Sequence, residues 1–205
     1  AMGRTVSVTE LEQAAECPFR YFLRYGLSLY EPDDEDSDED VWLDAKTRGQ
    51  LLHGLYATFW RMTWERGATE PTAAVAAAVR RRAEDLLDEW AVTHPARGLV
   101  MEHERAVLLR DVDRFLATEL EASSRRTSGT PTAVGQAVGG EVPFGMTDAD
   151  VDAAPMGRGS ADAITLALDD GAMRINFRGR IDRIERVPTD EPEARHAYAV
   201  VDYKT

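Results

Sequence analysis

The 205-residue chain contains a single cysteine, Cys17, so an internal disulfide framework is excluded. It has no apolar run of the about 20 residues that a membrane-spanning helix needs, and no basic-then-apolar segment that would indicate a secretory signal. The ATP-binding pattern GxxxxGK(S/T) is absent as well, so ATP hydrolysis by that motif is excluded. These absences predict a protein of the reducing cytoplasm that makes no membrane contact.

Positive charge is also scarce, because 24 Lys and Arg stand against 37 Asp and Glu, for a formal net charge of −13. Nucleic-acid-binding domains are usually basic, so this balance at first argues against DNA as a partner. Much of the excess is local, since residues 31–40 (EPDDEDSDED) hold eight acids and no base, and without them the net charge becomes −5. Such a run usually stays solvated. A local basic face or a carboxylate metal site elsewhere remains compatible with this composition.

Helical patterns dominate the first 140 residues. Ser7 and Glu10 have the spacing of a capping box, which predicts a helix start. Pro18 ends that helix and can begin the next one. Apolar periodicity and breaker residues predict further helices over residues 18–26, 44–66, 71–90 and 99–123. Residues 123–140 are rich in Ser, Thr, Gly and Pro and are predicted to form a loop.

Strand patterns dominate residues 141–205. The predicted strands cover residues 141–144, 163–168, 172–186 and 196–205. Helices followed by strands predict an α+β fold. We expect one domain over residues 1–205, with a mainly helical part (1–140) and a strand-rich part (141–205).

Three polar residues of the predicted strands suggest chemistry. Asp202 and Lys204 are two apart on one strand, so both would project from the same face. Asp182 lies on the polar face of the preceding strand, and pairing of the two strands would bring the carboxylates side by side. Two carboxylates can hold a divalent cation, which activates water and neutralises phosphate charge. A lysine beside them could orient the attacking water or stabilise the transition state.

Four ordered motifs make this interpretation more specific. They are SVTELEQAAECPFRYFLRY (7–25), GQLLH (49–53), GRIDRIE (179–185) and VVDYKT (200–205). In this order they resemble the motifs of RecB/AddB-type nuclease domains of the PD-(D/E)XK superfamily. The resemblance implies a restriction-endonuclease-like core, a small mixed sheet flanked by helices, after an N-terminal helical region.

The resemblance also implies a role for individual residues. His53, Asp182 and Asp202 would be metal ligands, together with the backbone carbonyl of Tyr203, and Lys204 would be the catalytic lysine. Gly49 and Glu141 would have supporting roles. An imidazole ligand is softer than a carboxylate, so the expected cation is Mg²⁺ or Mn²⁺ with a bias toward Mn²⁺.

The implied function is a metal-dependent DNA exonuclease module in repair and recombination, acting on single-stranded ends with a helicase. One alternative is a catalytically inactive DNA-binding or scaffolding module of a repair complex. Another is a helical protein-interaction domain with an incidental hairpin, in which His53 would lie far from Asp182. The family also continues beyond its DYKT motif with a helix and a closing strand, so we expect this chain to be a fragment that lacks the C-terminal part of the fold.

Several residues also have a purely structural interpretation. His53 alone suits a core or surface histidine, and Asp182 alone suits an ion pair with Arg180 or Arg183. Asp202 and Lys204 alone would suit a cross-strand salt bridge. Arg178 and Arg180 share the face of Asp182, either as a solvated strand face or as contacts to DNA phosphates.

Cys17 and the nearby aromatic residues leave a second set of alternatives. In the iron–sulfur branch of the family, a cysteine at the position of Cys17 joins three later cysteines around a cluster, which here would require cysteines beyond residue 205. A buried thiol is the structural alternative. The aromatic residues Phe19, Tyr21, Phe22 and Tyr25 are expected in the core rather than on a base-stacking surface.

Overall fold

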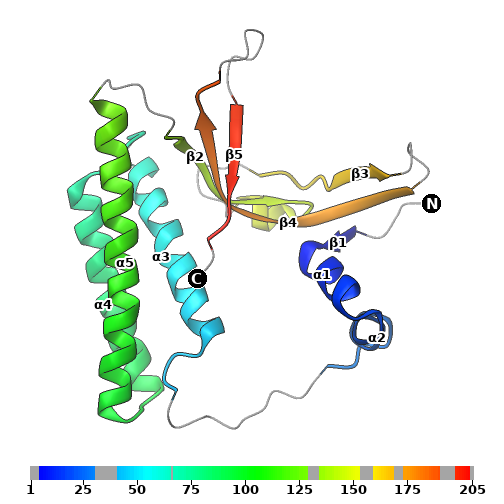
Figure 1. The fold of residues 1–205 in the computed structure, drawn as a ribbon, viewed down its shortest axis with the longest axis horizontal. Coiled ribbons are helices and arrows are strands. Elements are labelled where there is room, and N and C mark those ends of the chain that lie inside the picture. Colours follow the sequence, from blue (N-terminus) through cyan, green and yellow to red (C-terminus); the bar gives the residue numbers. More distant parts are fainter. Residues whose placement is uncertain are drawn as a thin grey trace. The chain divides into compact units, whose positions relative to one another are not determined.

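The computed structural model describes residues 5–30, 41–65, 67–128, 134–152, 159–168, 173–189 and 197–203. The acidic run 31–40 and Lys204 therefore lie outside the described residues. Two compact units make up the chain (Figure 1), and each combines separate stretches of sequence. We call Ser37–Gly140 with Asp182–Thr205 the helical unit, and Ala1–Asp36 with Glu141–Ile181 the sheet unit.

Three long helices form most of the helical unit: α3 (Ala45–Glu65), α4 (Ala73–Thr93) and α5 (Gly98–Thr127). The Asp44 carboxylate accepts the Thr47 amide at 2.6 Å ahead of α3, and the Thr72 hydroxyl caps α4. These side chains satisfy amides that a helix start leaves without partners. The three helices confirm the sequence prediction, although α5 extends past the predicted end at residue 123.

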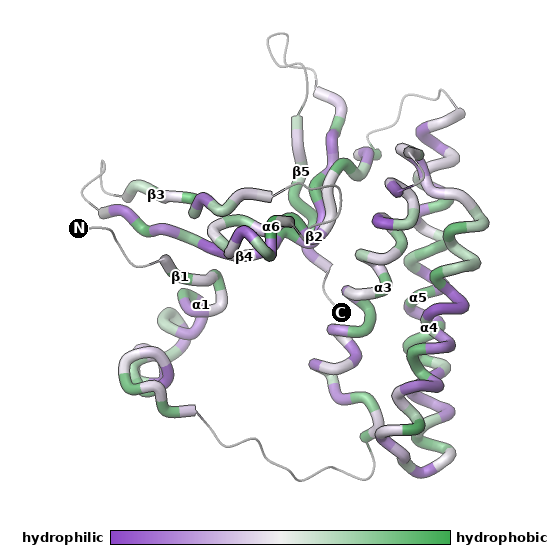
Figure 2. Tube along the Cα trace, turned by 180° about the vertical axis from the view of Figure 1, so that it is seen from behind, coloured by the Kyte–Doolittle hydropathy of each residue, from purple (hydrophilic) through white to green (hydrophobic). Residues whose placement is uncertain are grey.

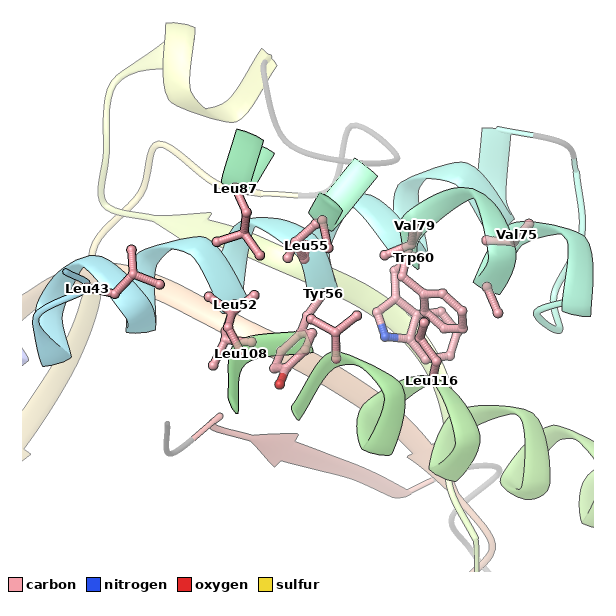
Figure 3. Packing of buried hydrophobic residues seen from close by; sticks show 14 of the residues in the cluster. Leu43, Leu52, Leu55, Tyr56, Trp60, Val75, Val79, Leu87, Leu108 and Leu116 are labelled. Atoms are coloured by element: carbon pink, nitrogen blue, oxygen red, sulfur yellow. The ribbon is translucent and has the colours of Figure 1, made fainter. Parts of the chain in front are cut away.

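The core of the helical unit lies between these helices. Figure 3 shows Leu52, Leu55 and Tyr56 packed among side chains from α4 and α5. Apolar positions recur along each of these helices, with hydrophilic positions between them (Figure 2). Each fully buried leucine, valine or phenylalanine contributes about 1.5–3 kcal/mol. The core also holds Trp42 and Trp60 as buried side chains and Trp64 and Trp90 as partly buried ones.

Three strands contribute residues to the helical unit. β5 (Ala197–Val201) belongs to it entirely, whereas β2 (Gln136–Phe144) and β4 (Met173–Val187) belong to it in part. β4 and β5 pair antiparallel, with Arg183 opposite Val201 and Val187 opposite Ala197. The predicted loop over residues 123–140 is wrong at both ends, since α5 reaches Thr127 and β2 begins at Gln136. The small residues that favoured a loop serve close packing instead, because a Cβ at Gly140 would lie 3.2 Å from the Trp64 ring.

The last predicted strand is also too long, because β5 ends at Val201. Tyr198 and Val200 are exposed on it, while the alternate residues are half-buried. In the described part of the chain, β5 pairs only with β4. It is therefore an edge strand there.

The sheet unit begins with β1 (Thr5–Ser7) and α1 (Val8–Glu16). β1 pairs parallel with β4, whereas β3 (Ile164–Leu168) pairs antiparallel with it. The capping box is present as predicted, since the Glu10 amide donates to the Ser7 hydroxyl at 3.1 Å and the Ser7 amide to the Glu10 carboxylate at 2.8 Å. The strand order β1-β4-β2 with mixed directions confirms a small mixed sheet and the α+β class.

Three short helices belong to the same unit: α2 (Pro18–Tyr21), the π-helical turn η1 (Phe22–Gly26) and α6 (Asp148–Asp152). The expectation of buried aromatic residues is wrong for Phe19 and Phe22, which are 68% and 52% exposed. No helix in the described ranges combines the length and apolar character needed to cross a bilayer.

Candidate metal centre

His53 lies on α3, one turn after Gly49, with 31% of its side chain exposed. Its Nε2 is 3.0 Å from the backbone carbonyl oxygen of Tyr203, and its Nδ1 is 3.6 Å from Oδ2 of Asp182. A carbonyl only accepts, so Nε2 carries the proton in this hydrogen bond, and Nδ1 faces the carboxylate. The imidazole thus lies between two oxygen atoms, a carbonyl oxygen and a carboxylate oxygen, that both come from the C-terminal part of the sequence.

Asp182 reaches this position through the β4–β5 hairpin. The ladder ends with Arg183 opposite Val201, so Asp182 is the next residue on β4 and Asp202 is the first residue after β5. Only 15% of the Asp182 side chain is exposed, and its Oδ2 accepts the Tyr203 amide at 2.9 Å. The carboxylate therefore holds the chain just beyond the last paired residue.

Aromatic contacts anchor Tyr203 from the other side. Its ring centroid lies 5.0 Å from that of Tyr56 on α3 and 5.9 Å from that of Phe115 on α5, both in edge-on geometry. Burial raises the pKa of the Tyr203 phenol to about 12, an effect that the Arg183 guanidinium partly offsets. The Tyr203 side chain is thus part of the helical core, while its backbone amide and carbonyl face Asp182 and His53.

Arg183 and Glu119 form a buried ion pair beside Tyr203, which the sequence did not predict. Arg183 pairs with Glu119 of α5 and with Glu185, the latter at 2.6 Å, and it is 11% exposed against 8% for Glu119. Burial alone would lower the pKa of Arg183, but the neighbouring Tyr203 and Glu119 outweigh that and raise it. One available signal was the acidic Glu119 within the apolar stripe of α5, where it follows Phe115 and Leu116 at helical spacing.

The other residues expected at the site are Asp202, Lys204 and Glu141. Asp202 is exposed directly after β5, and in the described part of the chain it does not join His53 and Asp182 within 4.8 Å. Lys204 lies outside the described residues. Glu141 belongs to the sheet unit and has a positive φ of 49°, an uncommon conformation for a residue other than glycine. Its carboxylate lies 3.6 Å from the Arg180 guanidinium.

The two arginines that were possible DNA contacts lie on β4 in the sheet unit. Arg178 and Arg180 are both exposed, on alternate residues of one strand face. Arg180 also approaches Asp150 at 4.0 Å. Hydrogen bonds from Thr147 lower the pKa of Asp150, with a smaller contribution from Arg180. Arg180 therefore has acidic neighbours, whereas the structure leaves the Arg178 side chain accessible.

Cys17 is exposed, so the interpretation as a buried thiol is wrong. Its sulfur instead accepts the Arg20 amide at 3.5 Å and caps the start of α2. An iron–sulfur cubane takes four thiolates. Cys17 is the only cysteine of this sequence, so the residues present do not suffice to hold a cluster.

The grouped residues do suit a divalent cation. His53, Asp182 and the Tyr203 carbonyl offer one imidazole, one carboxylate and one neutral oxygen, all within the helical unit. Neighbouring ligands of an octahedral cation bound at about 2.1 Å lie about 3 Å apart, and the nitrogen left free to bind, Nδ1, lies 3.6 Å from Oδ2 of Asp182. The 3.6 Å separation also contradicts the helical interaction domain as an explanation of His53.

The chain is similar to known proteins over nearly its whole length. The family model described as the PD-(D/E)XK nuclease superfamily matches residues 5–205. A protein of Limosilactobacillus fermentum, named as a subunit of an ATP-dependent helicase/deoxyribonuclease, is 29% identical over 216 residues, covering 98% of this chain and 16% of that protein. Proteins of the same name from Symbiobacterium thermophilum and Desulforudis audaxviator are 28% and 31% identical over 202 and 207 residues. The chain covers 15% of the length of each of these two.

Proposed function

The chain belongs to the PD-(D/E)XK nuclease superfamily, and from this premise we propose that it hydrolyses phosphodiester bonds of DNA with a divalent cation. The superfamily match also agrees with the restriction-endonuclease-like fold expected from the motifs. The observation that carries the proposal is the convergence of His53, the Asp182 carboxylate and the Tyr203 carbonyl in one unit. All three were expected to be ligands from the sequence.

We propose that these three groups, with the Asp202 carboxylate, hold Mg²⁺ or Mn²⁺. Such a cation supplies Lewis acidity, which activates water and offsets charge on the phosphate. The imidazole of His53 makes the ligand set softer than an all-oxygen set and favours Mn²⁺. Glu141 is proposed as a supporting carboxylate, and Gly49 as the position that allows close backbone approach one turn before His53.

Lys204 is the proposed catalytic lysine. It follows Tyr203 directly, and Tyr203 is fixed by its ring and by both of its backbone polar groups. An ammonium group held there would orient the attacking water or stabilise charge on the phosphate as the bond breaks.

The substrate is proposed to be single-stranded DNA ends, processed by exonucleolytic cleavage during repair and recombination. Arg178 and Arg180 would contact phosphates near the cleaved bond. The curated relatives carry helicase and deoxyribonuclease in their names, and the chain spans only 16% and 15% of the length of two of them. A helicase domain or subunit is therefore the proposed partner, and the cytoplasm the proposed location. An iron–sulfur role of Cys17 is proposed only for a longer chain that supplies three further thiolates.

The test is a cleavage assay with end-labelled single-stranded DNA and either Mn²⁺ or Mg²⁺. We expect cleavage by the unchanged protein and a loss of roughly a hundredfold or more in Asp182→Ala, because the cation loses a charged ligand. Equal cleavage by both proteins would sink the proposal. Salt-dependent DNA binding without any cleavage, in the presence of bound Mn²⁺, would instead favour the inactive DNA-binding or scaffolding module.

A further inference from the structure

Arg183 connects three parts of the helical unit. Its guanidinium pairs with Glu119 on α5 and with Glu185 on its own strand, the latter at 2.6 Å. It also lies over two rings, 5.8 Å from the centroid of Trp60 on α3 and 5.5 Å from that of Tyr203. A planar, forked cation is suited to such a site because it binds two carboxylates and stacks on aromatic faces at once.

Stability alone does not explain this ion pair. Arg183 and Glu119 are 11% and 8% exposed, so both lose most of their hydration. Taking a charged pair out of water costs about as much as the attraction returns, and apolar side chains of similar size often serve stability equally well. A buried pair of this kind therefore suggests a requirement for position rather than for folding energy.

The position in question is that of Tyr203. β5 ends at Val201, so the ladder with β4 does not hold the backbone of Tyr203. Yet its amide donates to Asp182 at 2.9 Å and its carbonyl accepts from His53 at 3.0 Å. Both hydrogen bonds require one orientation of the Tyr203 backbone. The contacts of the Tyr203 ring with Tyr56, Phe115 and Arg183 maintain that orientation.

We propose that Arg183, held in place by Glu119, is a positioning residue that fixes the Tyr203 backbone between Asp182 and His53. This inference rests on the proposed function, because the positioned groups are the proposed cation ligands. Arg183 acts through the Tyr203 ring, over which its guanidinium lies.

The test compares two double variants of the full chain. In R183M/E119L the buried pair behind Tyr203 is replaced by apolar side chains. In R126M/E70L the same replacement is made at a matched pair, because Arg126 and Glu70 are 11% and 19% exposed, join at 2.8 Å and belong to the same unit. Two quantities are measured: Mn²⁺ affinity by calorimetry, and hydrogen exchange of the Tyr203 amide by NMR without metal.

For R183M/E119L we expect Mn²⁺ affinity to fall about tenfold or more, the usual effect of losing a group that orients a ligand, together with faster exchange of the Tyr203 amide. For R126M/E70L we expect both quantities to stay within about twofold of the unchanged protein, because Arg126 and Glu70 bond to Gly135 and Gln136 rather than to Tyr203. Similar changes in both variants would mean that any buried pair has this effect, and would overturn the proposal. Unchanged amide exchange in R183M/E119L would also overturn it.

A milder single variant keeps the proposal testable if the double variants do not fold. Arg183→Lys keeps the positive charge beside Glu119 but cannot bridge both carboxylates or stack as a plane. We expect the same changes as in R183M/E119L with smaller size, and an unaffected Tyr203 amide would count against the proposal. If the unchanged protein binds no Mn²⁺, the proposed function fails, while the amide exchange still decides whether Arg183 positions Tyr203.

Discussion

The backbone amide of Tyr203 donates to the carboxylate of Asp182 at 2.9 Å, across 21 residues of sequence. This hydrogen bond joins the residue after Asp202 to the one expected ligand of β4, so the DYK and GRIDR motifs meet through a main-chain group. A carboxylate that accepts an amide is oriented as well as charged. Orientation and charge can therefore be separated by substitution.

The first prediction separates them with Asp182→Asn. The amide oxygen of asparagine can still accept the Tyr203 amide, but the negative charge is lost. We expect the melting temperature to stay within a few degrees of the unchanged protein, while Mn²⁺ affinity falls about tenfold or more. Calorimetric titration and thermal unfolding followed by circular dichroism measure the two quantities. Undiminished Mn²⁺ affinity would remove Asp182 from the ligand set.

The second prediction concerns stability at high pH. Burial raises the pKa of Tyr203 from 10.0 to about 12. Because the folded state holds this proton more tightly than the unfolded one, the stabilisation is fully present below about pH 10 and is lost as pH rises from about 10 to about 12. Two pKa units correspond to roughly 3 kcal/mol. Tyr203→Phe keeps the ring and removes the proton, so it should lose less stability over this range.

Urea unfolding at about pH 9 and about pH 11.5, for both proteins, checks this expectation. All other residues are the same in the two proteins, so their contributions cancel in the comparison. Parallel loss of stability in the two proteins would show that Tyr203 does not titrate abnormally. Tyr203→Ala serves as the contrasting variant, since it also removes the ring that anchors the backbone between Tyr56 and Phe115.

The third prediction concerns the glycine of the GRIDR motif. A Cβ at Gly179 would lie 3.0 Å from the ring of Phe144 on β2, closer than ordinary contact. Gly179→Ala should therefore destabilise the sheet unit by about 1–3 kcal/mol through overpacking. The double variant G179A/F144L should recover part of that loss, because the smaller side chain vacates the contact. Additive losses in denaturant titrations would contradict this account.

The fourth prediction concerns Gly54, which has the opposite surroundings. It lies inside α3, and among the described residues nothing comes within 4 Å of a Cβ added there. Glycine in a helix interior costs up to about 1 kcal/mol relative to alanine. Gly54→Ala should thus stabilise the helical unit by up to about 1 kcal/mol in urea unfolding. A destabilised variant would indicate that this face of α3 is occupied.

Local signals in the sequence predicted the elements well where neighbours in sequence decide the structure. The capping box of Ser7 and Glu10 and the periodic stripe of α3 depend on residues three or four positions apart. The start of β2 was missed because its small residues are also typical of loops. Their reason for being in a strand is the close approach of Gly140 to Trp64, a contact between residues far apart in the sequence.

The sequence likewise predicted some residues of the candidate site and missed others. The motifs identified His53, Asp182 and Tyr203 as a set, and the structure brings these three together. Their roles as cation ligands stay a prediction, as do those of Asp202 and Lys204. The pairing of Arg183 with Glu119 could not be predicted from the sequence. A charged residue in an apolar stripe indicates that it has a partner, but not which residue that partner is. That partner lies 64 residues away in the sequence.

The division of the tryptophans between the two units has a practical result. All four of them, at positions 42, 60, 64 and 90, belong to the helical unit. Intrinsic tryptophan fluorescence will therefore report the unfolding of that unit alone, while the sheet unit stays spectroscopically silent at the same wavelength. Trp60, which lies beside Arg183, makes the emission a built-in optical probe of the neighbourhood of the candidate site.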